Sequence, residues 1–340
     1  MMATKLRVLL FALAIVAGGC KDKRTGDTSS EGDQVTTAIR FHLAAERGDL
    51  AQLHSLIADG CSPDTRDKNG FTALHTAAKH GQVGVVEFLI ARGADVNAQT
   101  PTSNGPLFVA ASSGRADITK LLVAAGANVN AGKERGYTPL YAAGGLLANQ
   151  DHEDVVRLLL ASGAEIVPGD TRENEALLCF AVERGMHELM QKLLASGASP
   201  NTVSHLGTGR SVLGEAVALG DAEAVRLLIA AGADVDKRDA RGWVPLQYAR
   251  RWSRNAVEVL LAEGADIHRG LLVHWFVDAD EPEILGLLLS HGADVNQKDE
   301  AGRTPLDEIL TVNPAHKDMI ELLQKHGGLR GKQERTGSSI

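Results

Sequence analysis

Aromatic residues and cysteines are scarce in this 340-residue chain. Phe, Trp and Tyr make up 4% of it and there are 3 cysteines, although 44% of the residues are hydrophobic. Compact cores usually contain large rings, so a composition dominated by alanine, leucine and valine favours thin layers of closely packed helices. The net charge of −8 argues against general nucleic-acid binding, which requires a basic surface. At this length we expect several domains or an array of repeats.

Sequence motifs of enzymes are missing as well. The chain has no HExxH, no GxxxxGK[ST] and no GxSxG segment, and its 12 histidines are scattered. An enzyme with its site in a groove would need clustered His, Asp and Glu side chains, which the sequence does not show. We therefore expect no catalytic residue, no metal, no cofactor and no small-molecule substrate.

Residues 1–19 have the layout of a secretory signal peptide. A basic start at Lys5 and Arg7 precedes an apolar run from Val8 to Ala17, and small residues then lead to Cys20. The apolar run has about ten residues, fewer than the roughly 20 that cross a bilayer. The sequence therefore predicts a cleaved export signal and no permanent transmembrane helix.

The end of this segment, VAGGC, resembles the lipobox of bacterial lipoproteins, although Ala17 stands where that family prefers leucine. The resemblance implies cleavage before Cys20 and attachment of acyl chains, such as palmitate, to that cysteine. Lys21 follows the cysteine, which by the same resemblance implies the outer membrane with the protein facing the periplasm. The alternative is an ordinary secretory signal with a chance cysteine.

The polar segment that follows predicts a tether. KDKRTGDTSSEGDQ contains no apolar residue to bury, so we expect residues 20–37 to form the lipidated cysteine and a flexible linker. The folded domain is then expected over residues 38–327, and residues 328–340 are expected to form a disordered tail.

A Gly-Ala-Asp/Asn-Val-Asn phrase recurs along the chain, after apolar clusters such as FLIARG and LLVAAG. It begins at Gly93, Gly126, Gly232 and Gly292, with variants at Gly60, Gly163, Gly197 and Gly264. Thr-Pro-Leu stands upstream at Thr138 and Thr304. This pattern resembles the ankyrin repeat over about residues 38–327. The resemblance implies an all-α solenoid of about nine stacked helix-turn-helix units with hairpin fingers, in which each unit is stabilised by its neighbours.

The individual residues of one repeat agree with that interpretation. Thr72 can cap a first helix, and Gly81 can end it in the left-handed conformation. The apolar residues from Val85 to Ile90 follow helical spacing and predict a second helix, which Gly93 ends.

Cys61 and Cys179 fall in the first and fifth repeats. Because packed helices lie about 8–10 Å apart, these two cysteines are too distant for a disulfide and are expected to be buried packing residues.

The resemblance also implies a recognition surface formed by the fingertips and the exposed sides of the first helices. The residues expected there are Phe71, Lys79, Tyr137, Arg241, Trp243, Arg251, Trp252 and Arg303. The seventh repeat crowds two of the tryptophans together with Arg250, Arg251 and Arg254. Two interpretations are open: this patch docks an acidic surface, since Trp and Arg dominate interface hot spots, or the tryptophans cover a defective joint beside the shortened eighth repeat.

These expectations combine into a membrane-anchored protein that binds another protein and catalyses nothing. It would serve an envelope or periplasmic partner as adaptor, scaffold or inhibitor. An immunity protein that neutralises an antibacterial toxin is an alternative, and a structural envelope component held by lipid alone is another.

Overall fold

The computed structural model describes residues 31–133, 137–145, 151–168, 171–204 and 209–331. The predicted signal peptide, Cys20 and the tail beyond residue 331 lie outside the described residues. The chain divides into two compact units, Met1–Leu177 and Leu178–Ile340, and helix α10 (Thr171–Glu183) crosses the division. The secondary structure is helical, apart from isolated bridges between Arg66 and Thr72 and between Val203 and Ser211 among the residues described. The all-α prediction is therefore confirmed.

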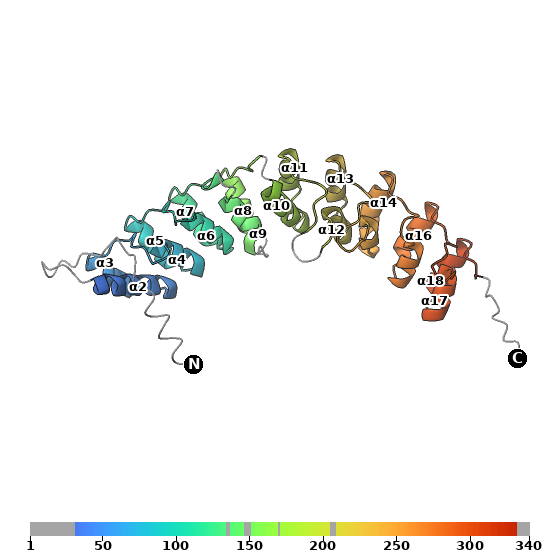
Figure 1. The fold of residues 1–340 in the computed structure, drawn as a ribbon, viewed down its shortest axis with the longest axis horizontal. Helices are drawn as coiled ribbons and strands as arrows, with labels where there is room; N and C mark the ends of the chain where they lie inside the picture. The colour runs from blue at the N-terminus through green and yellow to red at the C-terminus, as the bar shows by residue number, and fades with distance from the viewer. Residues whose placement is uncertain (1–30, 134–136, 146–150, 169–170, 205–208, 332–340) are drawn as a thin grey trace. The chain divides into compact units, whose positions relative to one another are not determined.

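Unit 1 consists of helix pairs stacked side by side (Figure 1). One row of first helices and one row of second helices pack against each other and along the stack. The first helices are α2 (Glu31–Arg47), α4 (Ala73–His80), α6 (Pro106–Ser112) and α8 (Pro139–Gly144). The second helices are α3 (Leu50–Ala58), α5 (Val83–Ala91), α7 (Ala116–Ala124) and α9 (Asp151–Ala161).

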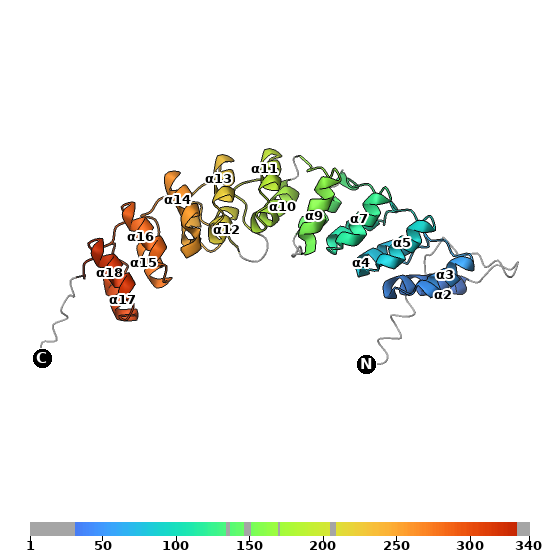
Figure 2. The same cartoon turned by 180° about the vertical axis from the view of Figure 1, so that it is seen from behind.

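Unit 2 repeats the arrangement, as the view from behind in Figure 2 also shows. Its first-helix row contains α12 (Val212–Leu219), the 3-10 turns η2 (Pro245–Tyr248) and η3 (Arg251–Ser253), α15 (Leu272–Asp278) and α17 (Pro305–Val312). Its second-helix row contains α11 (His187–Ala195), α13 (Ala222–Ala230), α14 (Arg254–Ala262), α16 (Pro282–Ser290) and α18 (Lys317–Lys325).

The second repeat shows how the sequence pattern forms one layer. Thr72 caps α4 in an extended conformation, and Gly81 ends this helix with φ +78°. Ala77 and Ala78 are fully buried, so the short side chains let neighbouring helices approach closely. Leu89 on α5 is also fully buried, as the apolar spacing predicts.

Successive layers are joined by a ladder of amide hydrogen bonds between their fingers. The Asn97 side chain donates to Gly126 O (3.2 Å) and accepts from the backbone N–H of Asn128 (2.8 Å). The asparagines at the same position in other repeats make the same pair of bonds to the following repeat: Asn130 to Gly163 and Glu165, Asn201 to Gly232 and Asp234, and Asn296 to Gly327 and Leu329. The final asparagine of the repeated phrase therefore links layers.

Four repeats have another residue at this position. Asp64 and Asp236 still accept one backbone N–H of the following repeat, from Asp95 (2.9 Å) and Asp266 (3.1 Å), whereas the other two make no such side-chain bond among the described residues.

Val167 and His268 occupy the asparagine position in the other two repeats; valine carries no hydrogen-bonding group, and the His268 ring makes no such bond within the described part of the chain. Beside His268 the finger is missing, as predicted, and Leu271 takes a left-handed conformation (φ 56°) at the start of α15. The joint between the seventh and eighth repeats must therefore rely on other contacts.

The structure departs from the prediction at two places. Helix α2 begins at Glu31, within the segment expected to be a tether. In the seventh repeat the expected first helix is absent and two 3-10 turns replace it, because Arg250 is extended (φ −132°, ψ 168°). Arg250 stands where the second repeat has the fully buried Ala78, and a charged side chain does not fit that inner position.

Candidate partner-binding surface

The fingertips are fixed by an aspartate at the same position in three repeats. In the seventh repeat, Asp239 Oδ1 accepts the backbone N–H groups of Arg241 (2.8 Å) and Trp243 (3.1 Å). Asp67 and Asp299 hold the second and ninth fingers with the same pair of bonds. Such a turn uses the aspartate carboxylate to satisfy the tip backbone, so the tip side chains start from a rigid base.

The residue that closes each finger is aromatic in three repeats, and each ring has a neighbour. Phe71 lies edge-on to His75 (5.4 Å between ring centroids). Tyr137 contacts Tyr141 edge-on at 5.9 Å, and its residue is 58% exposed. Tyr137 is therefore the ring of this group most available to a partner in unit 1. The tip residues Glu134 and Arg135 beside it lie outside the described residues.

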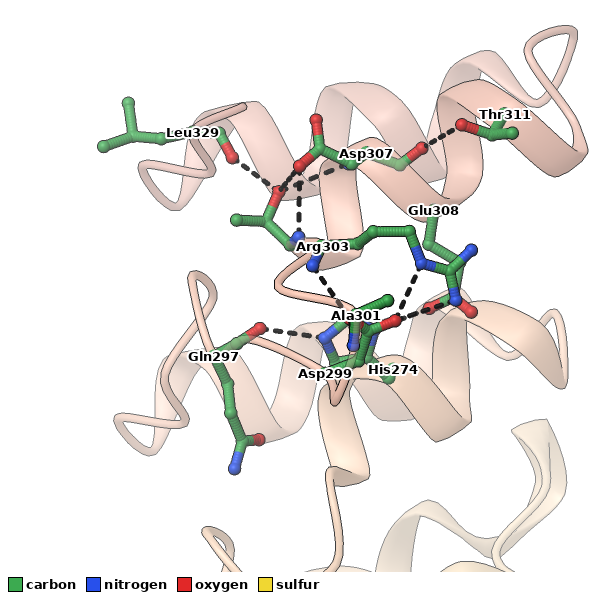
Figure 3. Close-up of polar contacts among 10 residues, drawn as sticks. His274, Gln297, Asp299, Ala301, Arg303, Asp307, Glu308, Thr311 and Leu329 are labelled. Atoms are coloured by element: carbon green, nitrogen blue, oxygen red, sulfur yellow. Dashed lines mark hydrogen bonds and ion pairs between the residues drawn. The ribbon is translucent and has the colours of Figure 1, made fainter. Parts of the chain in front are cut away.

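Arg303 closes the ninth finger and is held by Asp299 (Figure 3). Its Nε donates to Asp299 Oδ2 at 2.8 Å, and Nη2 lies 2.7 Å from the same oxygen. The hydrogen bond and charge of Asp299 raise the pKa of Arg303. Slight desolvation raises the pKa of Asp299, but the bonds from Arg303 outweigh it and this pKa lies below its ordinary value. A partner must therefore compete with an existing ion pair for Arg303.

His274 lies below this finger and holds together the last two repeats (Figure 3). Its Nδ1 is 2.6 Å from Glu308 Oε2 and its Nε2 is 2.8 Å from Gln297 O. The ring therefore bridges a carboxylate of the ninth repeat and a backbone carbonyl of the eighth repeat. The His274 side chain is 8% exposed and is therefore not available to a partner.

His75 stands at the equivalent position in the second repeat, and its ring is neutral. Its Nδ1 accepts the backbone N–H of Thr72 (3.1 Å), while Nε2 donates to Asn104 O (3.1 Å). Burial lowers the pKa of His75 to about 4. The ring therefore caps α4 and ties the second repeat to the third.

The first-helix residues expected at the surface are exposed. Lys79 lies in the last turn of α4, and Arg251 and Trp252 lie in η3. Trp252 is 59% exposed, yet its orientation is fixed because Nε1 donates to Ala218 O at 2.9 Å. The Arg251 guanidinium carbon is 5.9 Å from the centroid of this ring.

Trp243 has a different environment from Trp252. It packs edge-on against Trp275 of the eighth repeat, with 4.4 Å between the ring centroids, and lies tilted against Tyr248 of its own repeat at 5.3 Å. Trp275 Nε1 donates to Gln247 O at 3.0 Å, which ties the eighth repeat to the seventh. These contacts cross the joint that lacks the ladder, as expected for a ring that covers a defective joint.

The arginines of the seventh repeat are divided in the same way. Arg250 pairs with Glu281 of the eighth repeat (3.8 Å), and Arg254 pairs with Glu258 (3.0 Å). Arg251 contributes its backbone N–H to Glu281 Oε2 (2.8 Å), but no described carboxylate forms an ion pair with its guanidinium. The patch thus contains a structural half around Trp243 and an open half around Arg251 and Trp252.

Sequence reasoning missed Trp275 and Glu281, which complete that joint. No distinctive sequence signal marks Trp275, because Phe180 and Tyr248 occupy the same position in other repeats, and Glu281 is one of three acidic residues from Asp278 to Glu281.

Cys61 and Cys179 are both buried, as predicted, but Cys61 is disulfide-bonded and so is more than a packing residue, whereas Cys179 remains a thiol. The described residues contain no group of three or more His, Cys, Asp and Glu side chains arranged to hold a metal ion.

Family models for ankyrin repeats match most of the chain. A model of three consecutive ankyrin repeats matches residues 41–133, 84–170 and 178–270, and a single-repeat model matches residues 272–300. The chain belongs to the ankyrin repeat family. Because ankyrin repeats form scaffolds for protein interaction, this ankyrin repeat chain is a protein–protein interaction module.

Known ankyrin repeat proteins resemble parts of the chain. It is 34% identical over 117 residues to protein phosphatase 1 regulatory subunit 27 of Mus musculus (34% of this chain, 56% of the relative). It is 31% identical over 128 residues to cyclin-dependent kinase 4 inhibitor B of Bos taurus (36% and 96%). It is 30% identical over 153 residues to the E3 ubiquitin-protein ligase Ufd4 of Drosophila melanogaster (43% and 6%). The chain thus spans about half of the phosphatase subunit and a small part of the ligase.

Among solved structures, the human ASB11 ankyrin repeat domain is 29% identical to the chain. It matches with a TM-score of 0.45 over 66% of this chain and 98% of that domain.

Proposed function

We propose that this ankyrin repeat protein is a lipid-anchored component of a bacterial cell envelope that binds a protein partner in the periplasm. The VAGGC segment at Cys20 supports the anchor. No helix among the described residues is long and apolar enough to span a bilayer. Acylation of Cys20 would be the means of membrane attachment, probed by labelling with a palmitate analogue in wild type and in Cys20→Ala.

The partner-binding role is carried by one observation, the open half of the seventh-repeat patch. Trp252 presents a fixed, exposed ring beside the Arg251 guanidinium, which forms no ion pair with a described carboxylate. Interface hot spots are rich in Trp and Arg, so an exposed, fixed Trp252 ring beside the Arg251 guanidinium is suited to bind a partner. The positive charge fits a partner with exposed carboxylates.

The role as adaptor or inhibitor of an enzyme is our second step. Two relatives are named as a phosphatase regulatory subunit and a kinase inhibitor, which are proteins that act on enzymes. By analogy the chain would hold or block an envelope enzyme; an immunity protein against an antibacterial toxin is the narrower version of the same role.

Affinity purification of the mature protein from envelope extract, followed by mass spectrometry, tests this proposal. We expect a stoichiometric partner that is retained by wild type and lost from the double variant Arg251→Ala, Trp252→Ala. Arg226→Ala is the matched control, because Arg226 is an exposed arginine on the second-helix row, paired with Glu223 at 3.2 Å. Recovery of no stoichiometric partner would contradict the binding role and favour a structural envelope component.

A further inference from the structure

Exposed apolar side chains in unit 2 recur at one position of successive repeats. Leu219, Trp252 and Val312 are 46%, 59% and 68% exposed, and each stands at the carboxyl end of the first-helix segment of its repeat. Ala279 occupies the same position in the eighth repeat. Among the described residues of unit 1, Arg47, His80 and Ser113 stand at this position and are polar; Leu146 of the fourth repeat lies outside the described residues. We call Leu219, Trp252, Ala279 and Val312 the apolar row.

Contacts between adjacent repeats place these residues side by side. Trp252 Nε1 bonds to Ala218 O, next to Leu219. A Cβ at Gly220 would lie 3.2 Å from Trp252 Cδ1, so this ring covers the end of α12.

Between the next repeats, Arg251 bonds to Glu281 just after Ala279. His316 Nε2 lies 2.7 Å from Asp280 Oδ1 and connects the eighth and ninth repeats at the same level. These bonds join neighbouring repeats near the residues of the apolar row, which stand at the same position of successive repeats along the first-helix row.

The two ends of the apolar row carry opposite charge. Near Leu219 and Trp252, Arg184 lies in the preceding repeat at the same position, with its guanidinium carbon 5.6 Å from the Phe180 ring. Arg184 and Arg251 form no ion pair with any carboxylate of the described ranges.

At the other end, Val312 lines a pocket of about 100 Å³ whose wall includes Asp278, Asp280 and Glu308. Asp280 and Glu308 each have a histidine partner, whereas Asp278 is exposed. The surface beside the apolar row thus has arginines in the fifth and seventh repeats and acidic residues in the eighth and ninth.

We propose that the apolar row docks an extended segment of a partner protein. Packed helices lie about 8–10 Å apart and an extended chain advances about 3.3 Å per residue, so successive repeats meet every third residue of the segment. The segment would carry apolar side chains facing Leu219, Trp252 and Val312, one carboxylate facing Arg184 and a second facing Arg251, and a Lys or Arg entering the pocket beside Asp278. This inference rests on the proposed protein-binding function and states which chemistry the partner has.

A phage-displayed library of random 15-residue peptides, selected against the full chain, tests the proposal. We expect enriched peptides with apolar residues at i, i+3 and i+9, an acidic residue before them and a basic residue near the last. Their affinity should fall at least tenfold in the triple variant Leu219→Ser, Trp252→Ser, Val312→Ser. The control is Leu43→Ser, Leu50→Ser, Val83→Ser, which removes three exposed apolar side chains of unit 1 and should leave the affinity unchanged.

A charge reversal tests the direction of binding. Asp278→Lys should weaken a selected peptide severalfold, and replacing the basic residue of that peptide by Glu should restore its affinity. Melting curves of all variants show whether they remain folded. Enriched peptides without the pattern, undiminished binding to the Ser triple variant, or no enrichment at all would each overturn the proposal. The Ser triple variant also serves to capture the partner from envelope extract. If it captured the partner as well as wild type does, the role of the apolar row would be overturned, but the protein-binding function would stand.

Discussion

Acidification should weaken unit 1 through His75, and the size of the effect follows from its environment. His75 is 0% exposed, and burial lowers its pKa from 6.5 to about 4 in the folded chain. Between these values the unfolded chain binds a proton that the folded chain does not, so stability rises with pH across this window. At about 1.4 kcal/mol per pKa unit, the loss from pH 7 to pH 4 is about 3 kcal/mol.

The matched variant comes from the chain itself. In the seventh repeat, Gln247 occupies the position of His75, and its Oε1 accepts the backbone N–H of Val244 at 3.0 Å. His75→Gln should therefore keep the cap of α4, leave stability at pH 7 nearly unchanged, and remove the proton-linked loss.

The assay is urea unfolding between pH 4 and pH 7, with hydrogen exchange of the α4 amides as a local measure of unit 1. Titration of carboxylates affects both proteins equally, so the difference between wild type and His75→Gln isolates the histidine. If the two proteins lost stability in parallel from pH 6.5 to pH 4, the argument from burial would be refuted.

Three further changes test the packing of the stack by thermal and urea unfolding. Asn97→Ala removes both ladder bonds to the third repeat and should cost about 1–2 kcal/mol, since each net hydrogen bond contributes about 1 kcal/mol. Gly214→Ala should cost about 1–3 kcal/mol, because the new methyl would lie 2.8 Å from Tyr248 Cδ2. Trp243→Ala should cost about 2–3 kcal/mol by removing the ring that contacts the eighth repeat.

Each of these changes has a control. Gly84→Ala is the control for Gly214→Ala. The new methyl at position 84 would lie 3.6 Å from its nearest neighbour, Leu50 Cδ1, so this change on a helix should stabilise the chain by up to about 1 kcal/mol. Trp252→Ala should change the melting temperature little, since this ring is mostly exposed, and equal losses for both tryptophans would contradict the division of the patch. A ladder asparagine whose removal had no measurable cost would show that backbone packing alone joins the layers.

Much of the candidate surface could be predicted from sequence because its position in a repeat fixes its exposure. Lys79 and Arg251 stand near the ends of first-helix segments, where the predicted pattern leaves side chains in solvent, and the structure exposes both. The lipid anchor at Cys20 remains a prediction from the VAGGC segment.

The two tryptophans of the seventh repeat could not be separated from sequence. Both belong to one repeat, but the environment of Trp243 is set by Trp275 of the next repeat, and that of Trp252 by the end of α12 in the previous one. The 3-10 turns of the seventh repeat have the same cause. Whether Arg250 fits at the inner position depends on the neighbouring layers. In the structure its side chain instead pairs with Glu281 of the eighth repeat.

The periodic features of this protein follow from its amino-acid pattern alone: where helices begin and end, which faces are apolar, and that the layers stack. These are local consequences of capping residues, left-handed glycines and helical spacing, so they repeat wherever the phrase repeats. The tertiary structure decided which residues join the layers and which remain open to a partner. That choice depends on contacts between repeats, where one valine, histidine or arginine in place of the usual residue removes a bond and another side chain has to replace it.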